Sequence, residues 1–195
     1  MLLVTEKGTN KLGSYRVPDD GTTDAPVLTA SASVTPFGFA FDRRGHALVS
    51  EAFGGAVNAS AVSSYGFGIP TPASPAVISA SVGTTQTAAC WVVVTPNGRY
   101  AYVTNTGSGT ISSYSVQKSG KLSLAQPVAA TAGAGPIDAA LSASGGYLFV
   151  LNEAASRFLR SAWAKTAAWQ TQAACRVCPS AQTGWRQTEQ ALAEA

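Results

Sequence analysis

The amino-acid sequence predicts an all-β fold: a partial β-propeller of about three blades, followed by a non-β C-terminal tail. One observation is a repeated segment, in which a hydrophobic strand leads into Thr or Ser, then Asn or Glu, a turn and a second strand ending in Ser-Tyr. Another is its period, because the central valines of four copies are separated by 45, 54 and 47 residues (Val4, Val49, Val103 and Val150). Such a period is typical of propellers, in which each blade is a four-stranded antiparallel sheet.

The copies of the repeat differ in completeness. Residues 101–116 read AYVTNTGSGTISSYSV, and residues 2–17 (LLVTEKGTNKLGSYRV) align with them without a gap. A third copy starts at Ala47 with five extra residues in its turn, and a fourth starts at Leu148 and soon loses the pattern. The composition fits a turn-rich β protein, since 46% of the residues are hydrophobic, 12% are charged and 19 are glycine.

The strands of one unit are clearest between residues 89 and 128. Residues 89–95 (ACWVVVT) are almost wholly apolar, which is typical of a buried strand and predicts the innermost position. Residues 96–98 (PNG) form a turn, because Pro fixes φ and Asn-Gly tolerates positive φ. The second, third and outer strands follow at residues 100–105, 110–116 and from 122 to 128.

The same frame fits two further units. In one, a strand at residues 37–41 precedes a turn at 42–45 and a second strand at 47–50. In the other, a strand at 137–141 precedes a turn at 142–146 and a second strand at 147–152. A generic β-sandwich would not repeat its turn chemistry in register, so the repeat favours the propeller.

The chain changes character near Ala155, which predicts two regions, a partial propeller at 1–155 and a tail at 156–195. The tail holds three of the four tryptophans and one of the 19 glycines, and it lacks strand alternation. We expect it to be helical or disordered. One hypothesis is that it is read out of frame: if residues 161–169 are encoded by codons that end in G or C, a shift of one base can restore a glycine-rich turn. The alternative is a genuine C-terminal extension.

The charge and composition of the chain exclude several classes of binding partner. Residues 1–155 hold eight Lys or Arg and eight Asp or Glu, so we expect no nucleic-acid binding. No apolar run approaches the roughly 20 residues that span a bilayer. Met1 leads directly into a predicted strand, so we expect no signal peptide in this sequence. A lone C-x-x-C at 175–178 and a single histidine, His46, give a weak metal signal, so we predict no metal and no cofactor.

The motif at residues 102–105 carries a family resemblance. It reads Tyr-Val-Thr-Asn and follows Pro-Asn-Gly-Arg at 96–99, which resembles the YVTN repeat of bacterial seven-bladed propellers of the lactonase family. The resemblance covers about residues 1–155 and extends to propeller-type 6-phosphogluconolactonases and fungal carboxymuconate cyclases. It implies a WD40/YVTN-like propeller whose parent is a hydrolase opening a sugar lactone, so the expected partner is a small-molecule lactone or sugar.

Such a propeller needs about seven units of about 45 residues, and this chain holds the end of one blade, two full blades and the start of another. The sequence therefore predicts a fragment that is inactive alone and self-associates through open blade edges. The alternative function is a non-catalytic binding or scaffold module. The resemblance is compatible with a secreted or periplasmic parent, and the compartment of this chain is left open.

Alignment of the predicted inner strands places Gly38, Trp91 and Asp138 at one position. The resemblance implies that this position faces the central funnel where ligands bind, so Trp91 and Asp138 are candidate ligand contacts. Asp138 is a lone carboxylate in an apolar run, and burial there would raise its pKa and suit it to act as a general base. The alternative is a structural Asp that caps neighbouring backbone N–H groups.

Glu51 is the second candidate catalytic carboxylate. It shares a repeat position with Glu6, Asn105 and Asn152, where a side chain that bonds turn N–H groups favours a structural role. The long turn at 52–61 after Glu51 could nevertheless bring it over the funnel. His46 lies in a tight turn, where a solvent-facing role is favoured over a catalytic one.

Overall fold

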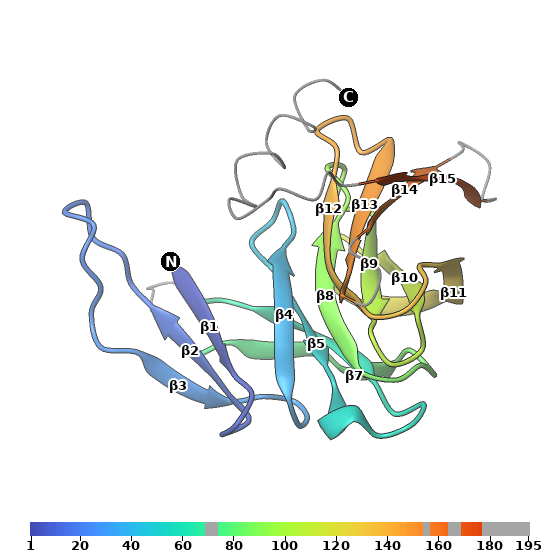
Figure 1. Cartoon of the computed structure of the whole chain (residues 1–195). Helices are drawn as coiled ribbons and strands as arrows, with labels where there is room; N and C mark the ends of the chain where they lie inside the picture. Colours follow the sequence, from blue (N-terminus) through green and yellow to red (C-terminus); the bar gives the residue numbers. More distant parts are fainter. Residues whose placement is uncertain (69–73, 154–156, 164–168, 177–195) are drawn as a thin grey trace.

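The computed structural model describes residues 1–68, 74–153, 157–163 and 169–176. The described chain is built from four antiparallel sheets arranged side by side in an open array rather than a closed ring (Figure 1). Each sheet is a simple meander, in which consecutive strands pair with one another. The predicted all-β propeller architecture is therefore confirmed.

The third sheet shows the complete blade. It orders its strands from inside to outside as β8 (Ala89–Val94), β9 (Tyr100–Asn105), β10 (Thr110–Val116) and β11 (Leu122–Thr131). These bounds match the predicted strands closely. The turn between β8 and β9 closes with the N–H of Gly98 donating to the carbonyl of Thr95 at 2.7 Å, and Gly98 has a φ of 66°. The turn predicted from Pro-Asn-Gly is therefore present, and glycine suits it because glycine adopts a positive φ without strain.

The second and fourth sheets repeat this order, and the first lacks an inner strand in the described chain. The second consists of β4 (Pro36–Phe41), β5 (Ala47–Glu51), β6 (Ala61–Gly66) and β7 (Ala76–Gly83), with a short 3-10 turn, η1 (Phe53–Gly55), after β5. The first contains β1 (Leu2–Glu6), β2 (Lys11–Tyr15) and β3 (Val27–Ala30). The fourth contains β12 (Pro136–Leu141), β13 (Tyr147–Asn152), β14 (Arg157–Trp163) and β15 (Trp169–Arg176). One edge of β1 is consequently unpaired in the described chain.

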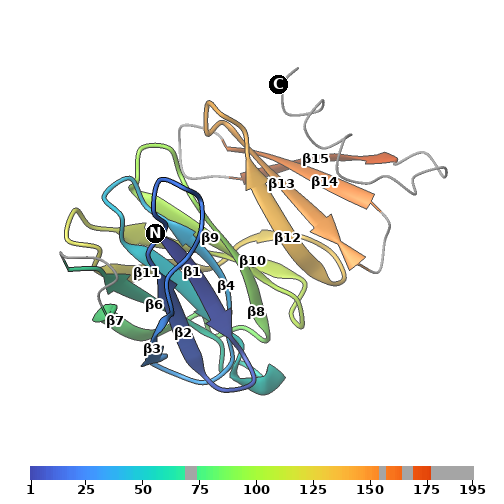
Figure 2. The ribbon, with the colours of Figure 1, turned by 90° about the vertical axis from the view of Figure 1, so that its left-hand side faces the viewer.

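The core lies between neighbouring sheets. The inner strands β4, β8 and β12 are neighbours in space, and Figure 2 shows the fourth sheet fanning away from the first two. Each interface is filled by small, aliphatic and aromatic side chains, which lets twisted sheets pack face to face. The interface of the second and third sheets is formed mainly by Leu48, Val62, Val92, Val103 and Tyr114.

The Ser-Tyr at the end of the repeat joins one sheet to the sheet before it. Tyr65 and Tyr114 occupy equivalent positions on β6 and β10, and both are fully buried. The Tyr65 hydroxyl accepts the N–H of Ala32 at 2.8 Å, and the Tyr114 hydroxyl donates to the carbonyl of Val82 at 2.8 Å. A buried phenol requires such a partner, which explains why the repeat retains tyrosine here.

The backbone beyond residue 156 differs from the helical or disordered segment that the composition suggested. Arg157–Trp163 forms β14, which pairs with β13, and Trp169–Arg176 forms β15, which pairs with β14. The physical reason is that β13 would otherwise present a row of unpaired backbone groups, and an adjacent extended segment satisfies them whatever its side-chain pattern. Residues 177–195 lie outside the described residues, and the out-of-frame hypothesis stays a hypothesis.

Candidate functional site

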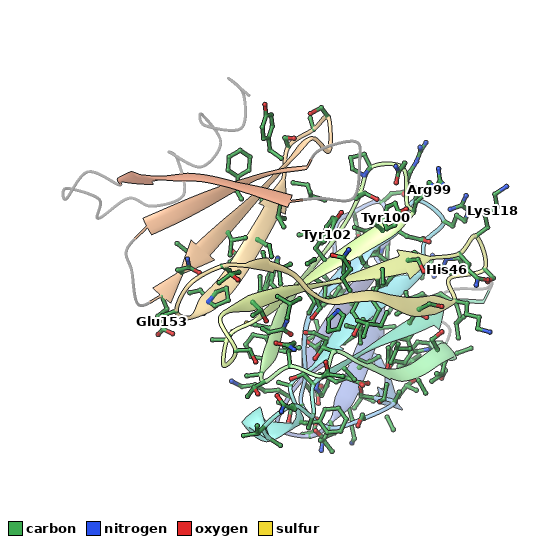
Figure 3. The ribbon with its side chains drawn as sticks, turned by 90° about the vertical axis from the view of Figure 1, so that its right-hand side faces the viewer. His46, Arg99, Tyr100, Tyr102, Lys118 and Glu153 are labelled. Carbon is green, nitrogen blue, oxygen red and sulfur yellow. The ribbon has the colours of Figure 1, made fainter. Side chains whose placement is uncertain are left out.

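The candidate site lies where the inner strands begin. In every sheet the second strand ends at the same side of the molecule, so residues just after β1, β9 and β13 lie beside the start of an inner strand. We call this side the funnel end. Glu153, directly after β13, lies there, far from the opposite end of the sheets (Figure 3).

A β-bulge occurs at the start of each inner strand. The register shifts by one residue between Pro36 and Phe39, between Ala89 and Val92, and between Pro136 and Asp138. Each bulge places one extra residue on the inner strand, and bulges commonly re-aim side chains near functional sites. The predicted alignment of Gly38, Trp91 and Asp138 therefore corresponds to one structural position on three successive inner strands.

Hydroxyl groups on the second strands hold the bulges of the second and third sheets. The side chain of Ser50 accepts the N–H of Gly38 at 3.0 Å, and Thr104 accepts the N–H of Trp91 at 2.9 Å. The Ser50 hydroxyl also donates to the carbonyl of Cys90 on the next sheet at 2.6 Å, as Thr5 does to the carbonyl of Phe37 at 2.6 Å. The Thr or Ser of the repeat thus fixes the inner strand of its own sheet, the next sheet, or both.

Asp138 is half-buried at the funnel end. The N–H of Ala139 donates to one carboxyl oxygen at 2.6 Å, and among the described residues the other oxygen accepts no hydrogen bond. Burial raises the pKa of Asp138, and the bond from Ala139 only partly opposes this. The structure therefore contains both features considered for this residue: a backbone contact to its neighbour and a carboxyl group with an elevated pKa.

Trp91 occupies the equivalent position on the neighbouring inner strand. It is 37% exposed, a large value for an indole in a sheet of buried residues, while its backbone N–H is held by Thr104. An exposed indole offers an apolar face and one N–H donor, which is the chemistry that sugar rings commonly contact. Trp91 and Asp138 lie on neighbouring strands, because β8 and β12 are in contact.

Three polar residues that the sequence did not single out accompany this pair: Lys7, Thr106 and Glu153. Each directly follows the second strand of its sheet, so they share one repeat position. The Lys7 ammonium lies 5.3 Å from the centroid of the Phe37 ring, and the Thr106 hydroxyl donates to the carbonyl of Pro136 at 2.8 Å. The signal in the sequence was their common offset, one residue after the Asn or Glu of the repeat.

The Cys90 thiol lies among several of these polar and charged side chains. Burial raises the pKa of its thiol, and a hydrogen bond with Thr106 lowers it. The charge of Asp138 raises this pKa further, Lys7 lowers it and Glu153 raises it, so all three charges act at the same thiol. Charged groups of the first and fourth sheets therefore lie near Cys90 of the third sheet, whose Sγ donates to the carbonyl of Ile137 at 3.3 Å.

Glu51 has a different environment. Its side chain is fully buried, and its two oxygens accept hydrogen bonds from Ser63 on β6 and Ser81 on β7, each at 2.7 Å. Burial raises its pKa, and these hydroxyls only partly compensate. Because β6 and β7 lie on the outer side of β5, the carboxylate is directed away from the inner strand. At the equivalent position Asn105 donates to Ser112 at 2.9 Å.

His46 lies at the opposite end of the second sheet from the funnel end. Its Nδ1 lies 2.8 Å from one carboxyl oxygen of Asp42, and the other carboxyl oxygen accepts the backbone N–H groups of His46 and Arg44 at 2.9 and 2.8 Å. Burial alone would raise the pKa of Asp42, but these hydrogen bonds outweigh it and lower the pKa. The structure thus places His46 within a turn and away from Asp138.

Two further properties of the described residues bear on the site. No group of three or more His, Cys, Asp or Glu side chains in the described ranges is arranged to hold a metal ion. Among those same residues there is also no helix of sufficient length and apolarity to cross a bilayer.

Comparison with solved structures places the fold. A proposed 6-phosphogluconolactonase of Bacteroides uniformis is 19% identical, with a TM-score of 0.73, and the match covers 90% of this chain and 54% of that one. A protein of Lactobacillus plantarum is 20% identical with a TM-score of 0.71, covering 87% and 50%. The periplasmic gluconolactonase of Pseudomonas aeruginosa is 17% identical with a TM-score of 0.66, covering 87% and 50%. This chain therefore spans about half the length of these structures.

Sequence comparison identifies the family. No curated protein sequence matches the chain. The family model described as "Lactonase, 7-bladed beta-propeller" matches residues 72–191, which is more than half of the chain and includes strands β14 and β15. The repeated sheets, the bulged inner strands and this match agree, and the chain belongs to the lactonase family of seven-bladed β-propellers.

Proposed function

We propose that the whole protein to which this chain corresponds hydrolyses a sugar lactone at the funnel end, with Asp138 as the general base and Trp91 as a contact for the sugar. The observation that carries the proposal is the position of Asp138, a half-buried carboxyl with a raised pKa and one unoccupied oxygen among the described residues. The gluconolactonase names of similar structures support the choice of substrate class.

The chemistry requires a base and a stabiliser of negative charge. Water attacks the lactone carbonyl carbon while the base takes its proton, the bond to the ring oxygen breaks, and that oxygen receives a proton to give a hydroxy acid. An elevated pKa makes ionised Asp138 a stronger base than an ordinary carboxylate. Lys7, whose positive charge acts on Cys90 beside this position, is the candidate for stabilising the developing oxyanion.

Glu51 has no direct part in this proposal. Both of its oxygens are bonded to serine hydroxyls of the outer strands, and its side chain is fully buried, so neither oxygen is available to a substrate. We propose that it organises the second sheet, in which Ser81 adopts a φ of 44° with its hydroxyl held by Glu51. A rigid second sheet in turn fixes Gly38 against the neighbouring strand that carries Trp91.

We further propose that residues 1–195 alone are inactive. A funnel is formed by inner strands on all sides, and the described chain supplies β4, β8 and β12. The remaining walls would exclude water and complete the polar contacts to the substrate.

The test is opening of glucono-δ-lactone, followed by release of acid, for a full-length propeller of this sequence and for residues 1–195. We expect turnover by the full-length protein and none by 1–195. Asp138→Asn should reduce kcat by about 100-fold or more, because the base is lost while the shape is kept. Asp20→Asn, which changes an exposed carboxylate in the loop after β2, is the matched control and should have no effect.

Three results would each contradict a part of the proposal. Full turnover by Asp138→Asn would remove Asp138 from the mechanism. Binding of the lactone without turnover in the full-length protein would make the site a binding module instead of an active site. Turnover by 1–195 that is lost in its Asp138→Asn variant would show that the described sheets already form a complete site.

A further inference from the structure

The end of the molecule opposite the funnel end collects exposed cations on the second and third sheets. Three turns meet there: residues 42–46 between β4 and β5, 95–99 between β8 and β9, and 117–121 between β10 and β11. We call their cationic surface the basic face, and it is formed by Arg43, Arg44, Arg99, Lys118 and Lys121, with His46 among them. Figure 3 shows His46, Arg99 and Lys118 close together at one end, with Glu153 at the other.

The positive charge of the basic face is not neutralised within the described chain. All five of its Lys and Arg side chains are exposed, and none has a carboxylate within ion-pairing distance among the described residues. The one acid in these turns is Asp42, which is buried and bonded to His46 and the backbone. The loop at 16–26 carries three further acids, but it belongs to the first sheet, beyond β4 (Figure 1).

The basic face is continuous across two sheets. A Cβ atom placed on Gly98 would lie 3.5 Å from the Arg44 guanidinium, so Arg44 extends over the turn of the neighbouring sheet. A Cβ atom on Gly120 would lie 2.8 Å from the His46 ring, so the turn that carries Lys118 and Lys121 packs directly on His46. Five of the eight Lys and Arg residues in 1–155 are therefore gathered on one surface, although that region as a whole is neutral.

An exposed aromatic group lies beside these charges. Phe41 ends β4, immediately before the turn with Arg43 and Arg44, and it is 38% exposed. Its ring lies 6.0 Å from that of Phe67, which follows β6 at the same end. Basic side chains next to exposed aromatic rings are the combination that binds the headgroup region of anionic bilayers.

We propose that the basic face docks on a membrane surface that contains anionic phospholipid, with Phe41 entering the headgroup region. The cations project from the tips of separate turns at one end of the sheets, which suits a broad surface of negative charge. A bilayer also accommodates the phenyl ring, which a phosphate backbone would leave in water. The proposal is independent of the lactonase proposal, because it uses the opposite end of the molecule.

The test is flotation of residues 1–195 in a density gradient with vesicles, because bound protein rises with lipid whereas self-associated protein sediments. Vesicles of phosphatidylcholine with phosphatidylglycerol should carry the protein upward, and vesicles of phosphatidylcholine alone should not. Added salt should release the protein, since surface charges are screened. Each lysine or arginine near an anionic surface contributes about fivefold in affinity, so Arg43→Glu with Arg44→Glu should reduce binding at least about 25-fold.

Matched variants and competitors complete the test. Lys11→Glu changes an exposed cation of the first sheet at the funnel end and should leave flotation unchanged. Phe41→Ser should weaken binding but keep its salt dependence. The proposal is overturned if neither vesicle floats the protein, if both do so regardless of salt, or if the charge-reversed variant floats as well as the wild type. Preferential binding of an acidic peptide or of duplex DNA over the anionic vesicles would also overturn it.

Discussion

Individual residues of the repeat are explained by their buried partners. The position shared by Glu51 and Asn105 hydrogen-bonds a serine of the third strand in both sheets, once as an acceptor and once as a donor. A serine hydroxyl can play either part, so the sheet tolerates both residues. The two residues differ in charge, because Glu51 can ionise and Asn105 cannot. The stability of the second sheet should therefore depend on pH at this position, whereas that of the third sheet should not.

The first residue-scale prediction concerns stability against pH. Burial raises the pKa of Glu51 in the folded state, so the folded protein holds this proton more tightly than the unfolded chain. Its contribution to the free energy of unfolding is complete below the ordinary glutamate pKa and is lost as pH rises through the folded pKa. Glu51→Gln should remove this loss, measured by urea unfolding at a series of pH values.

The reciprocal change is the control for this prediction. Asn105→Glu places a carboxyl group at the same position of the third sheet and should introduce a decline of stability with rising pH. A Glu51→Gln variant with the same pH dependence as the wild type would contradict the assignment. Tyr102, whose pKa burial raises to about 12, remains protonated throughout such a series and does not interfere.

Sequence reasoning located Asp138 and Trp91 because their position recurs within one unit. It missed Lys7, Thr106 and Glu153 because their importance arises between units: each approaches the inner strand of another sheet. Pairing within a sheet follows from local alternation and turn residues, whereas contacts across sheets depend on twist and packing angle. A single sequence does not state these angles.

At the scale of elements, the inner strands pack so closely that one position admits only glycine. A Cβ atom on Gly38 would overlap the carbonyl of Cys90 and lie 2.9 Å from the Cα of Trp91. Both contacts are with the backbone of β8, which has no flexible side chain to move aside. The separation of β4 and β8 is therefore set by the absence of a side chain at Gly38.

We predict that Gly38→Ala destabilises the protein by about 3 kcal/mol or more, because the two inner strands must move apart. Gly83→Ala is the matched control, since a Cβ atom there has no neighbour within 4 Å and its φ is not positive. It should change stability by less than about 1 kcal/mol. Chemical unfolding of both variants measures the difference, and equal effects would show that β4 and β8 can separate freely.

Element boundaries were predictable where turn chemistry was strong, as at residues 96–98. The segment after residue 156 was not, because β14 and β15 lack the alternation that identifies a half-buried strand. Their extended backbone is explained by β13, whose edge would otherwise leave backbone N–H and C=O groups unpaired. The cause therefore lies in the neighbouring strand and not in the sequence of the segment itself. The strand propensity and hydrophobic pattern of a segment do not show that a neighbouring strand needs a pairing partner.

At the scale of the whole molecule, net charge was a poor guide. Residues 1–155 are neutral in total, yet the fold gathers five of their eight Lys and Arg residues, Arg43, Arg44, Arg99, Lys118 and Lys121, on one surface of the second and third sheets. The meander explains this, because alternate turns of each sheet fall at opposite ends. The sum of the charges along the chain therefore hides a local concentration of positive charge that appears only after folding.

The open array also leads to a prediction about association. β1 has an unpaired edge in the described chain, and Leu2 and Val4 on it are 45% and 36% exposed. We expect residues 1–195 to form oligomers or aggregates through such edges, as judged by light scattering after size-exclusion chromatography. Val4→Lys should shift the distribution towards smaller species, since a charged edge discourages strand pairing. A monodisperse wild-type monomer with a cooperative thermal transition would contradict this expectation.

The hydroxyls that join successive sheets have a mechanical consequence. Thr5 and Ser50 each bond the inner strand of the following sheet, and Thr104 stands at the same position of the third sheet. The fourth sheet has Leu151 there, which offers no hydroxyl to a sheet beyond it. In a closed ring pulled apart by force, the junction between the fourth sheet and the next would lack a hydrogen bond that the first two junctions possess, and rupture should begin there.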